Sequence, residues 1–146
     1  MKKISNKKVY HEYEILDTFE AGLVLLGHEV KSIKGGQMHL KGAYVILQKK
    51  EVFLVAAHVA PYKKASNIDD YDPYRTRKLL LNKKEIDKLF KTKSIKGLTI
   101  VPLSVYTKKG KIKVEIGIAR GKTQADKRAT VKKRELDRES RRHLMN

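Results

Sequence analysis

Alternating apolar and polar side chains in the carboxyl-terminal half of the chain predict a β-hairpin. From Lys111 to Ile118 every second residue is aliphatic, with Lys, Glu and Gly between, which is the period of a strand with one buried face. Residues 98–106 form the partner strand across a turn at 108–110. The apolar phase shifts around Pro102, which indicates a bulge or an edge position in that partner strand.

Other strands are predicted in the amino-terminal half. Residues 43–47 and 52–59 predict a second hairpin over a turn at 48–51. Within residues 13–19, apolar side chains have acidic residues between or beside them, which predicts an amino-terminal strand.

Two short helices interrupt the strands. Aliphatic residues recur at helical spacing over 26–33, and Gly35-Gly36 end that segment. Asn82 can cap a second helix, with Glu85 in capping-box spacing and a buried stripe within 86–90. Many short strands with two short helices predict a mainly β fold, an OB-like antiparallel β-barrel that is closed to hide its edges.

Charge divides the chain into two parts. With 34 Lys/Arg against 16 Asp/Glu, the net charge is +18, which favours a polyanionic partner, nucleic acid before membrane. Residues 121–146 hold nine of the basic residues and few apolar ones, so they cannot bury enough surface to offset their ordering entropy. We expect residues 1–120 to form an RNA-binding barrel, and 121–146 to be a basic tail, disordered when free and helical on its RNA partner.

Enzymatic chemistry has little support in the sequence. The chain has no Cys, and its five His show no metal-ligand spacing. Asp69-Asp70 with Asp72 could hold Mg²⁺, but turn-forming neighbours favour a solvated loop. We therefore expect no catalytic residue, no metal and no cofactor. Met1-Lys2-Lys3 is not followed by an apolar run, and no apolar stretch is long enough to span a bilayer, so we expect a cytoplasmic location.

Two features bear on the mode of nucleic-acid binding. Arg75 and Arg77 lie on one side of an extended segment and could hold neighbouring phosphates, or could be surface ion-pair partners of Asp69–Asp72. Seven Tyr, three Phe and no Trp are few for a protein that stacks single-stranded bases. Recognition of a folded RNA through its shape and backbone fits better.

A set of short motifs lies in the same order as in a known family and covers nearly the whole chain. The motifs are Asn6-Lys7-Lys8, His11-Glu12-Tyr13, Phe19-Glu20-Ala21-Gly22, Gly27 to Ser32, His58 to Tyr62, Asp72 to Leu81, Val101-Pro102-Leu103, Gly121-Lys122 and Asp126-Lys127-Arg128. Each is weak alone, but the ordered set resembles the SmpB family of SsrA-binding proteins. The resemblance implies an adaptor that binds the tRNA-like domain of transfer-messenger RNA (tmRNA) and delivers it to stalled ribosomes for trans-translation. It also implies an OB-like barrel with flanking helices and a tail that enters the small-subunit decoding centre and messenger channel, and contact with elongation factor Tu through tmRNA.

The resemblance also implies site residues. The residues expected to face tmRNA are Asn6, Lys7, His11, Glu20, Ala21, Gly22 and Leu80. Glu20 would accept hydrogen bonds from base edges or 2′-hydroxyl groups. RNA-backbone contacts are expected at Arg75, Arg77 and Lys78. The ribosome-binding tail is expected to act through Gly121, Lys122, Asp126, Lys127, Arg128, Lys132, Lys133 and Arg134.

Two other hypotheses stay open on sequence grounds. The chain could be a general single-stranded nucleic-acid-binding OB-fold protein, against which the few aromatic residues argue. It could also be an RNA-processing enzyme that pairs His11 or His58 with a carboxylate, against which the lack of a catalytic constellation argues.

Overall fold

The computed structural model of the chain describes residues 1–63, 70–123 and 128. The helices and strands within these residues follow the order β1 (Ile4–Ser5), α1 (Lys7–Glu12), β2 (Tyr13–Leu23), α2 (Gly27–Lys34), β3 (Met38–His39), β4 (Tyr44–Gln48), β5 (Glu51–Val55), β6 (His58–Val59), β7 (Arg77–Leu80), α3 (Lys83–Lys93), β8 (Leu98–Lys108) and β9 (Lys111–Gly121).

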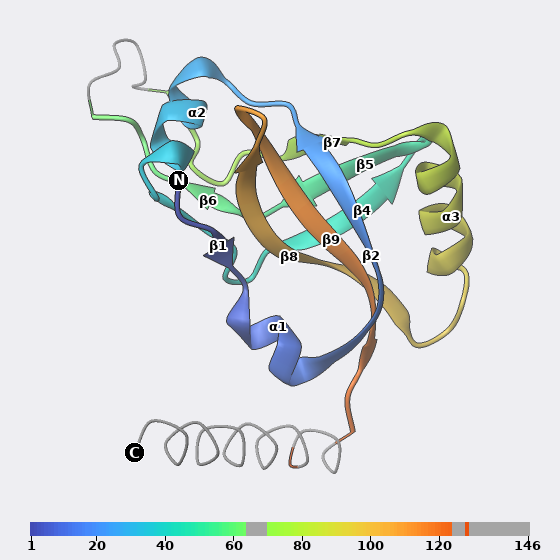
Figure 1. Ribbon diagram of the computed structural model, residues 1–146. Helices are drawn as coiled ribbons and strands as arrows, with labels where there is room; N and C mark the ends of the chain where they lie inside the picture. The colour runs from blue at the N-terminus through green and yellow to red at the C-terminus, as the bar shows by residue number, and fades with distance from the viewer. Residues whose placement is uncertain (64–69, 124–127, 129–146) are drawn as a thin grey trace.

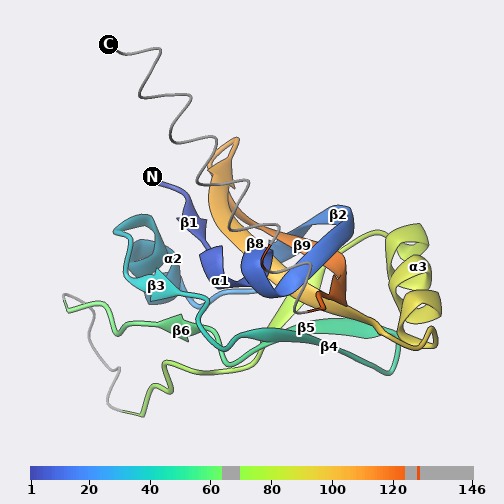
Figure 2. The same cartoon turned by 90° about the horizontal axis from the view of Figure 1, so that it is seen from below.

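Seven of these strands form one antiparallel sheet in the order β1-β8-β9-β2-β7-β5-β4. The sheet curls, so that β2, β8 and β9 face β4 and β5 across the core, and α3 lies at one side of the curl (Figures 1 and 2). The strands β3 and β6 form a separate two-stranded sheet beside α2. The prediction of a mainly β, OB-like antiparallel fold with flanking helices is confirmed.

The carboxyl-terminal hairpin follows its predicted pattern. β8 and β9 pair along their whole length, and Ile112, Val114 and Ile116 are buried in the core. The register shifts between Pro102 and Ser104, where the change of apolar phase predicted a bulge. Proline has no N–H for the ladder, so it is tolerated best at such an irregular position of a strand.

The helix that follows β7 is capped as predicted. The Asn82 side chain accepts a hydrogen bond from the Glu85 amide at 2.9 Å, and the Glu85 carboxylate accepts one from the Asn82 amide at 3.2 Å. Leu89 of this helix, α3, is fully buried in the core. A third helix, α1, has only Val9 buried. Its sequence therefore has no apolar stripe that would predict a helix.

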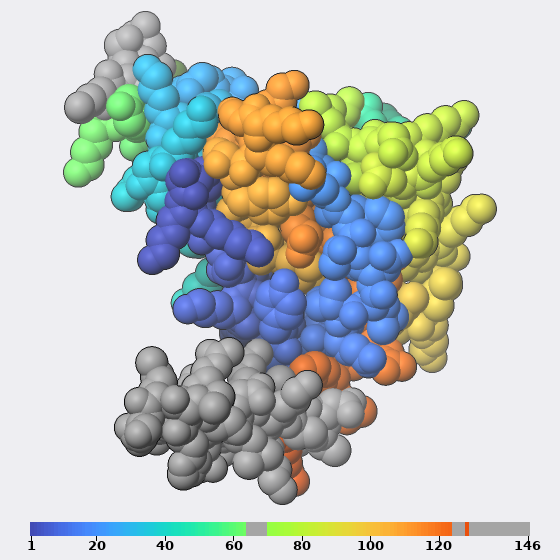
Figure 3. Space-filling view, in the orientation of Figure 1, coloured from blue at the N-terminus to red at the C-terminus, as the bar shows by residue number. Residues whose placement is uncertain are grey.

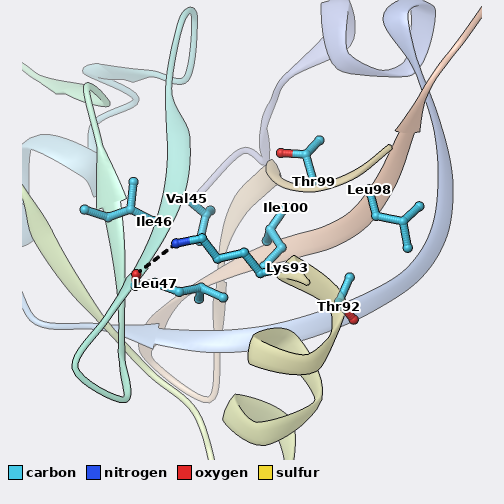
Figure 4. A pocket seen from close by; sticks show the side chains of 8 residues that line it. All are labelled: Val45, Ile46, Leu47, Thr92, Lys93, Leu98, Thr99 and Ile100. Carbon is cyan, nitrogen blue, oxygen red and sulfur yellow. Dashed lines mark hydrogen bonds between the residues drawn. The ribbon is translucent and has the colours of Figure 1, made fainter. Parts of the chain in front are cut away.

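The sheet is not closed, which corrects the expectation of a closed barrel. No ladder joins β4 to β1 or β8 among the described residues. Instead, side chains of β4 and β8 meet across a cleft, and Lys93 of α3 donates a hydrogen bond to the Leu47 carbonyl at 3.3 Å (Figure 4). Lys93 thus satisfies an edge acceptor that a neighbouring strand would otherwise bond, and α3 covers the seam.

The predicted strand over 52–59 is also corrected, because the structure divides it. Ala56 has a φ of 63°, in the left-handed region that ends an extended strand. β5 therefore stops at Val55, and His58–Val59 leave the main sheet to pair with β3 as β6.

Candidate nucleic-acid interface

One row of side chains crosses four strands on the outer face of the sheet. The ladder places Tyr106 of β8 opposite Lys113 of β9, and Lys113 opposite Gly22 of β2. Gly22 is in turn opposite Leu80 of β7, whose side chain is 53% exposed. Figure 3 shows the face on which β1, α1, β2 and the β8–β9 hairpin meet. Two of the predicted tmRNA-facing residues, Gly22 and Leu80, are therefore cross-strand neighbours.

Glu20 joins this row through hydrogen bonds. The Tyr106 hydroxyl donates to one carboxylate oxygen of Glu20 at 2.5 Å, and the Lys108 amine lies 3.3 Å from the other. The hydrogen bond from Tyr106, followed by the charges of Lys108 and Lys113, lowers the pKa of Glu20. Burial and the bond to Glu20 raise the pKa of Tyr106. The pair is thus a carboxylate with a protonated phenol, and each carboxylate oxygen keeps a lone pair for another donor.

Glycine at position 22 permits a close approach between two strands. A Cβ placed on Gly22 would lie 3.3 Å from the Leu80 Cβ and 3.8 Å from the Lys113 amine. Any larger side chain would push Leu80 away from β2. A shallow groove runs along this contact between β2, β7 and the tip of the β8–β9 hairpin, and Lys111 and Lys113 line it together with aliphatic side chains. The groove therefore combines apolar surface with positive charge.

The residues near α1 border the same sheet. Asn6 donates through its side chain to the Pro102 carbonyl at 3.0 Å and through its amide to the Leu103 carbonyl at 2.9 Å. Burial, followed by the charge of Glu115, raises the pKa of Tyr10 in α1. Glu115 is the residue that pairs with Glu20 across β2 and β9. Within α1, Lys7 is exposed and His11 is half-buried.

Ala21 is the member of the predicted tmRNA-facing set that does not fit. It lies between Glu20 and Gly22 on β2, so its side chain points to the opposite face, and it is fully buried in the core. The side chain of Ala21 is therefore not available to RNA in this structure. The resemblance covered a motif of consecutive residues, whereas a strand can present only alternate ones.

The arginine pair belongs to a buried charge network. Glu29 of α2 is fully buried, and its carboxylate binds Arg75 and Arg77 at 2.5 Å each. Tyr71 also donates to Glu29 at 2.7 Å. Burial would raise the pKa of Glu29, but hydrogen bonds from Arg75, the Leu26 amide, Tyr71 and Arg77 outweigh it and hold the pKa at about 2.

This network corrects the expectation for Arg77. Its side chain is completely buried, and its remaining donors bind the backbone carbonyls of Ala57 and Pro73. Arg77 therefore cannot contact an RNA backbone, and among the described residues its ion-pair partner is Glu29 rather than Asp70 or Asp72. Arg75 keeps 31% of its side chain exposed, and Lys78 is exposed beside Glu51 at 3.7 Å.

The carboxyl-terminal segment leaves the sheet next to α1. Gly121 pairs with Tyr13 at the end of β9. The Lys122 amide donates to the Glu12 carbonyl at 2.8 Å, and its side-chain amine donates to the Tyr10 carbonyl at 3.0 Å. The tail thus starts at the border of the face that carries Glu20. Arg128 is exposed, whereas the other tail residues of the prediction lie outside the described residues: Asp126, Lys127, Lys132, Lys133 and Arg134.

The sequence analysis missed three residues of this surface: Tyr106, Lys108 and Lys113. The alternation in β9 placed Lys113 on the solvent face but did not say which residues lie beside it. Tyr106 and Glu20 are 86 positions apart, so their contact depends on the register of two ladders. The sequence could have indicated these residues only if β8 had been aligned with β9 with the bulge near Pro102 taken into account.

Two other findings concern metal binding and membrane insertion. Across residues 1–63 and 70–123, no three His, Asp or Glu side chains come together as metal ligands would. Of the acidic loop considered for Mg²⁺, Asp69 lies outside the described residues. No helix in the described part of the chain has the length and apolar character that a membrane crossing requires.

The fold and this surface define a class: a basic, OB-like nucleic-acid-binding protein with a lysine-rich sheet face. Comparison with known proteins identifies the family. The family model described as "SmpB protein" matches residues 3–146, and the chain belongs to that family.

Individual relatives agree over nearly their full lengths. The SsrA-binding protein of Enterococcus faecalis is 50% identical over 141 residues, which are 97% of this chain and 91% of that protein. The SsrA-binding protein of Persephonella marina is 49% identical over 135 residues, 92% of this chain and 88% of that protein. A chain in a solved structure described as "tmRNA-SmpB: a journey to the center of the bacterial ribosome" is 41% identical, with a TM-score of 0.69 over 88% of this chain and 94% of that one.

Proposed function

We propose that this protein is an RNA-binding adaptor that binds the tRNA-like domain of tmRNA and delivers it to stalled ribosomes for trans-translation. The observation that carries the proposal is the 41% identity to a chain described together with tmRNA and the bacterial ribosome. The relatives named SsrA-binding protein support the same RNA. The proposed role needs no covalent chemistry from the protein, and a cytoplasmic location is proposed with it because the stalled ribosome is the proposed partner.

The outer sheet face suits a folded RNA. The Glu20 carboxylate is held in place by Tyr106. It can accept a hydrogen bond from a base edge or from a 2′-hydroxyl group. The lysines beside it can bind phosphates without reading sequence. Exposed Leu80 and the bare backbone at Gly22 leave room for a ribose or base to lie flat. Asn6, Lys7 and His11 extend this face along β1 and α1.

The two parts of the chain divide the work. Residues 1–120 hold tmRNA, and residues 121–146 form a basic tail that enters the decoding centre and messenger channel, ordering there as a helix. The tail emerges beside α1, so its start stays fixed relative to the bound RNA. Elongation factor Tu would be met through the tmRNA that the protein holds.

Replacement of Glu20 tests the proposed RNA site. We expect Glu20→Ala to weaken binding of the tRNA-like domain by roughly 5- to 150-fold, the range of a well-placed polar contact of about 1–3 kcal/mol. Glu14→Ala is the matched control, because it removes an exposed carboxylate from the same strand. Electrophoretic mobility shifts would compare a tRNA-like-domain transcript, bulk tRNA and a single-stranded RNA at several salt concentrations.

The same gels separate the alternatives. Equal affinity for all three RNAs, with only a steep dependence on salt, would indicate nonspecific backbone binding. Preference for the single strand would favour a general single-strand-binding protein, and cleavage of the probe would favour an enzyme. Unchanged binding by Glu20→Ala would contradict the assigned RNA site. The adaptor role would then be judged by whether the wild-type protein selects tmRNA over the other RNAs.

A further inference from the structure

Three aromatic rings pack together at the small second sheet, away from the surface assigned to tmRNA: His39 stacks on His58, and Tyr74 meets His58 edge-on. His39 of β3 is paired with His58 of β6, and their rings lie 4.7 Å apart and nearly parallel, at 8°. The Tyr74 ring packs against His58 at 5.0 Å and 60°. In Figure 2, β3 and β6 lie beside α2, on the opposite side of the molecule from α3.

This stack faces solvent. Met38 and Leu40 flank His39 and are buried in the core, as is Val59 next to His58. The alternation therefore points His39 outward, and His39 is exposed. Tyr74 is 52% exposed. The rings of His39 and Tyr74 therefore contribute little to the hydrophobic core and are open to a binding partner.

The surroundings suit an anionic partner with flat groups. Burial first, and then the charges of His39 and Arg77, lower the pKa of His58, so two facing imidazoles do not repel each other at neutral pH. Lys41 follows His39 on the exposed side of the same segment. A metal site is not indicated, because no third ligand joins the two His among the described residues.

We propose that the exposed His39 ring, stacked on His58, stacks on an unpaired nucleobase of RNA, so that the His39–His58 stack with Tyr74 beside it is a second RNA-binding site. His58 covers one face of the His39 ring, and His39 is exposed, so the other face of the ring is the one to receive a base. Any base can stack in this way, since every base has a π face. Lys41 would bind a phosphate of the same RNA segment. The inference rests on the proposed function as an RNA-binding adaptor. The base comes from tmRNA or from ribosomal RNA, and separate binding assays distinguish the two.

Substitution of His39 with an alanine or an aromatic residue tests the stack. We expect His39→Ala to weaken binding by roughly 5- to 150-fold, the range that one stacked base contributes, and His39→Phe to restore it. The probes are a tRNA-like-domain transcript in mobility shifts and purified ribosomes in sedimentation. Ile95→Ala is the control, because it removes a 54% exposed side chain at the far side of the molecule.

NMR gives a readout that does not depend on affinity. The imidazole C–H signals of His39, assigned by their absence in His39→Ala, should move upfield when RNA is added, owing to the ring current of the base. Loss of transcript binding in His39→Ala assigns the base to tmRNA, and loss of ribosome binding alone assigns it to ribosomal RNA.

Two results would overturn the proposal. One is an unchanged affinity of His39→Ala for both probes while Glu20→Ala is impaired, which rejects the stack and keeps the proposed function. The other is an unmoved His39 signal with saturating RNA. Failure of the wild-type protein to prefer the tRNA-like domain would instead count against the proposed function, and the His39 signal would still decide the stack.

Discussion

At the scale of single residues, the partners of Glu29 show how a buried structural role can be mistaken for an exposed function. Two arginines two positions apart look like a phosphate fork, but Arg77 is 0% exposed and its guanidinium bonds Glu29. A buried charge is tolerated only when it is paired and hydrogen-bonded. Glu29 therefore fixes α2 against β7 and the segment around Tyr71.

Loss of the charge of Glu29 should destabilise the protein. We expect Glu29→Gln to lower the free energy of unfolding by about 3–5 kcal/mol, because Arg77 then keeps a buried charge without a counter-ion. Urea denaturation at neutral pH would measure the change. Glu51→Gln, which breaks a 45% exposed pair with Lys78, should cost less than about 1 kcal/mol.

The difference in the free energy of unfolding between the wild-type protein and Glu29→Gln should depend on pH, and the pKa of Glu29 gives the direction. The folded-state pKa of Glu29 is about 2, below its ordinary value of 4.5, so its contribution is present above about pH 4.5 and is lost as the pH falls toward 2. In Glu29→Gln this component of acid sensitivity should disappear. An identical acid dependence in both proteins would contradict the assignment of this pKa.

At the scale of elements, the long alternating strands, the capped helix, α2 and β4 followed their sequence patterns, whereas β7 and α1 were not predicted. β7 contains Arg77 as an inward residue, and α1 has one buried side chain. Such segments lack a periodicity of their own, because their structure comes from the strands beside them. The two hairpin turns are local enough to be tested separately.

Gain of a glycine in one hairpin turn and loss of a glycine in the other should change the stability in opposite directions. Lys49 and Lys50 have φ values of 49° and 63°, and Lys109 and Gly110 have 52° and 77°, so both hairpins use two residues with positive φ. Lys50→Gly should stabilise the protein by about 0.5–1 kcal/mol, since it removes left-handed strain.

Gly110→Ala is the reciprocal variant and should destabilise the protein by about 1 kcal/mol. A Cβ at Gly110 meets no atom within 4 Å, so the cost comes from the backbone conformation alone. Thermal unfolding of both variants would measure these changes. If Lys50→Gly destabilised the protein, the assigned turn geometry would be wrong.

At the scale of the whole molecule, the sheet and the tail should be separable. β9 ends at Gly121, and Lys122 is bonded to α1, so the chain can be cut after Thr123 without removing a described contact of the sheet. The 23 residues that follow hold eight Lys/Arg against four Asp/Glu.

Truncation after Thr123 should keep the preference for the tRNA-like domain over bulk tRNA but abolish peptide tagging on stalled ribosomes. The selective surface remains, while the segment proposed to enter the messenger channel is gone. Reconstituted trans-translation with tmRNA would measure tagging, and mobility shifts would measure the preference. Tagging at the wild-type level would contradict the proposed role of the tail.

The sequence by itself determined the antiparallel β class, the capped helix α3 and the basic character, because periodicity, capping and charge are properties of the chain that need no partner. Its ordered motifs indicated the family. Only the tertiary structure decided that Arg77 is buried, that Ala21 faces the core and that the sheet stays open beside β4. It also joined Glu20 to Tyr106 and His39 to His58. These outcomes depend on which strands pair and in which register, and a shift of one residue turns every side chain to the opposite face.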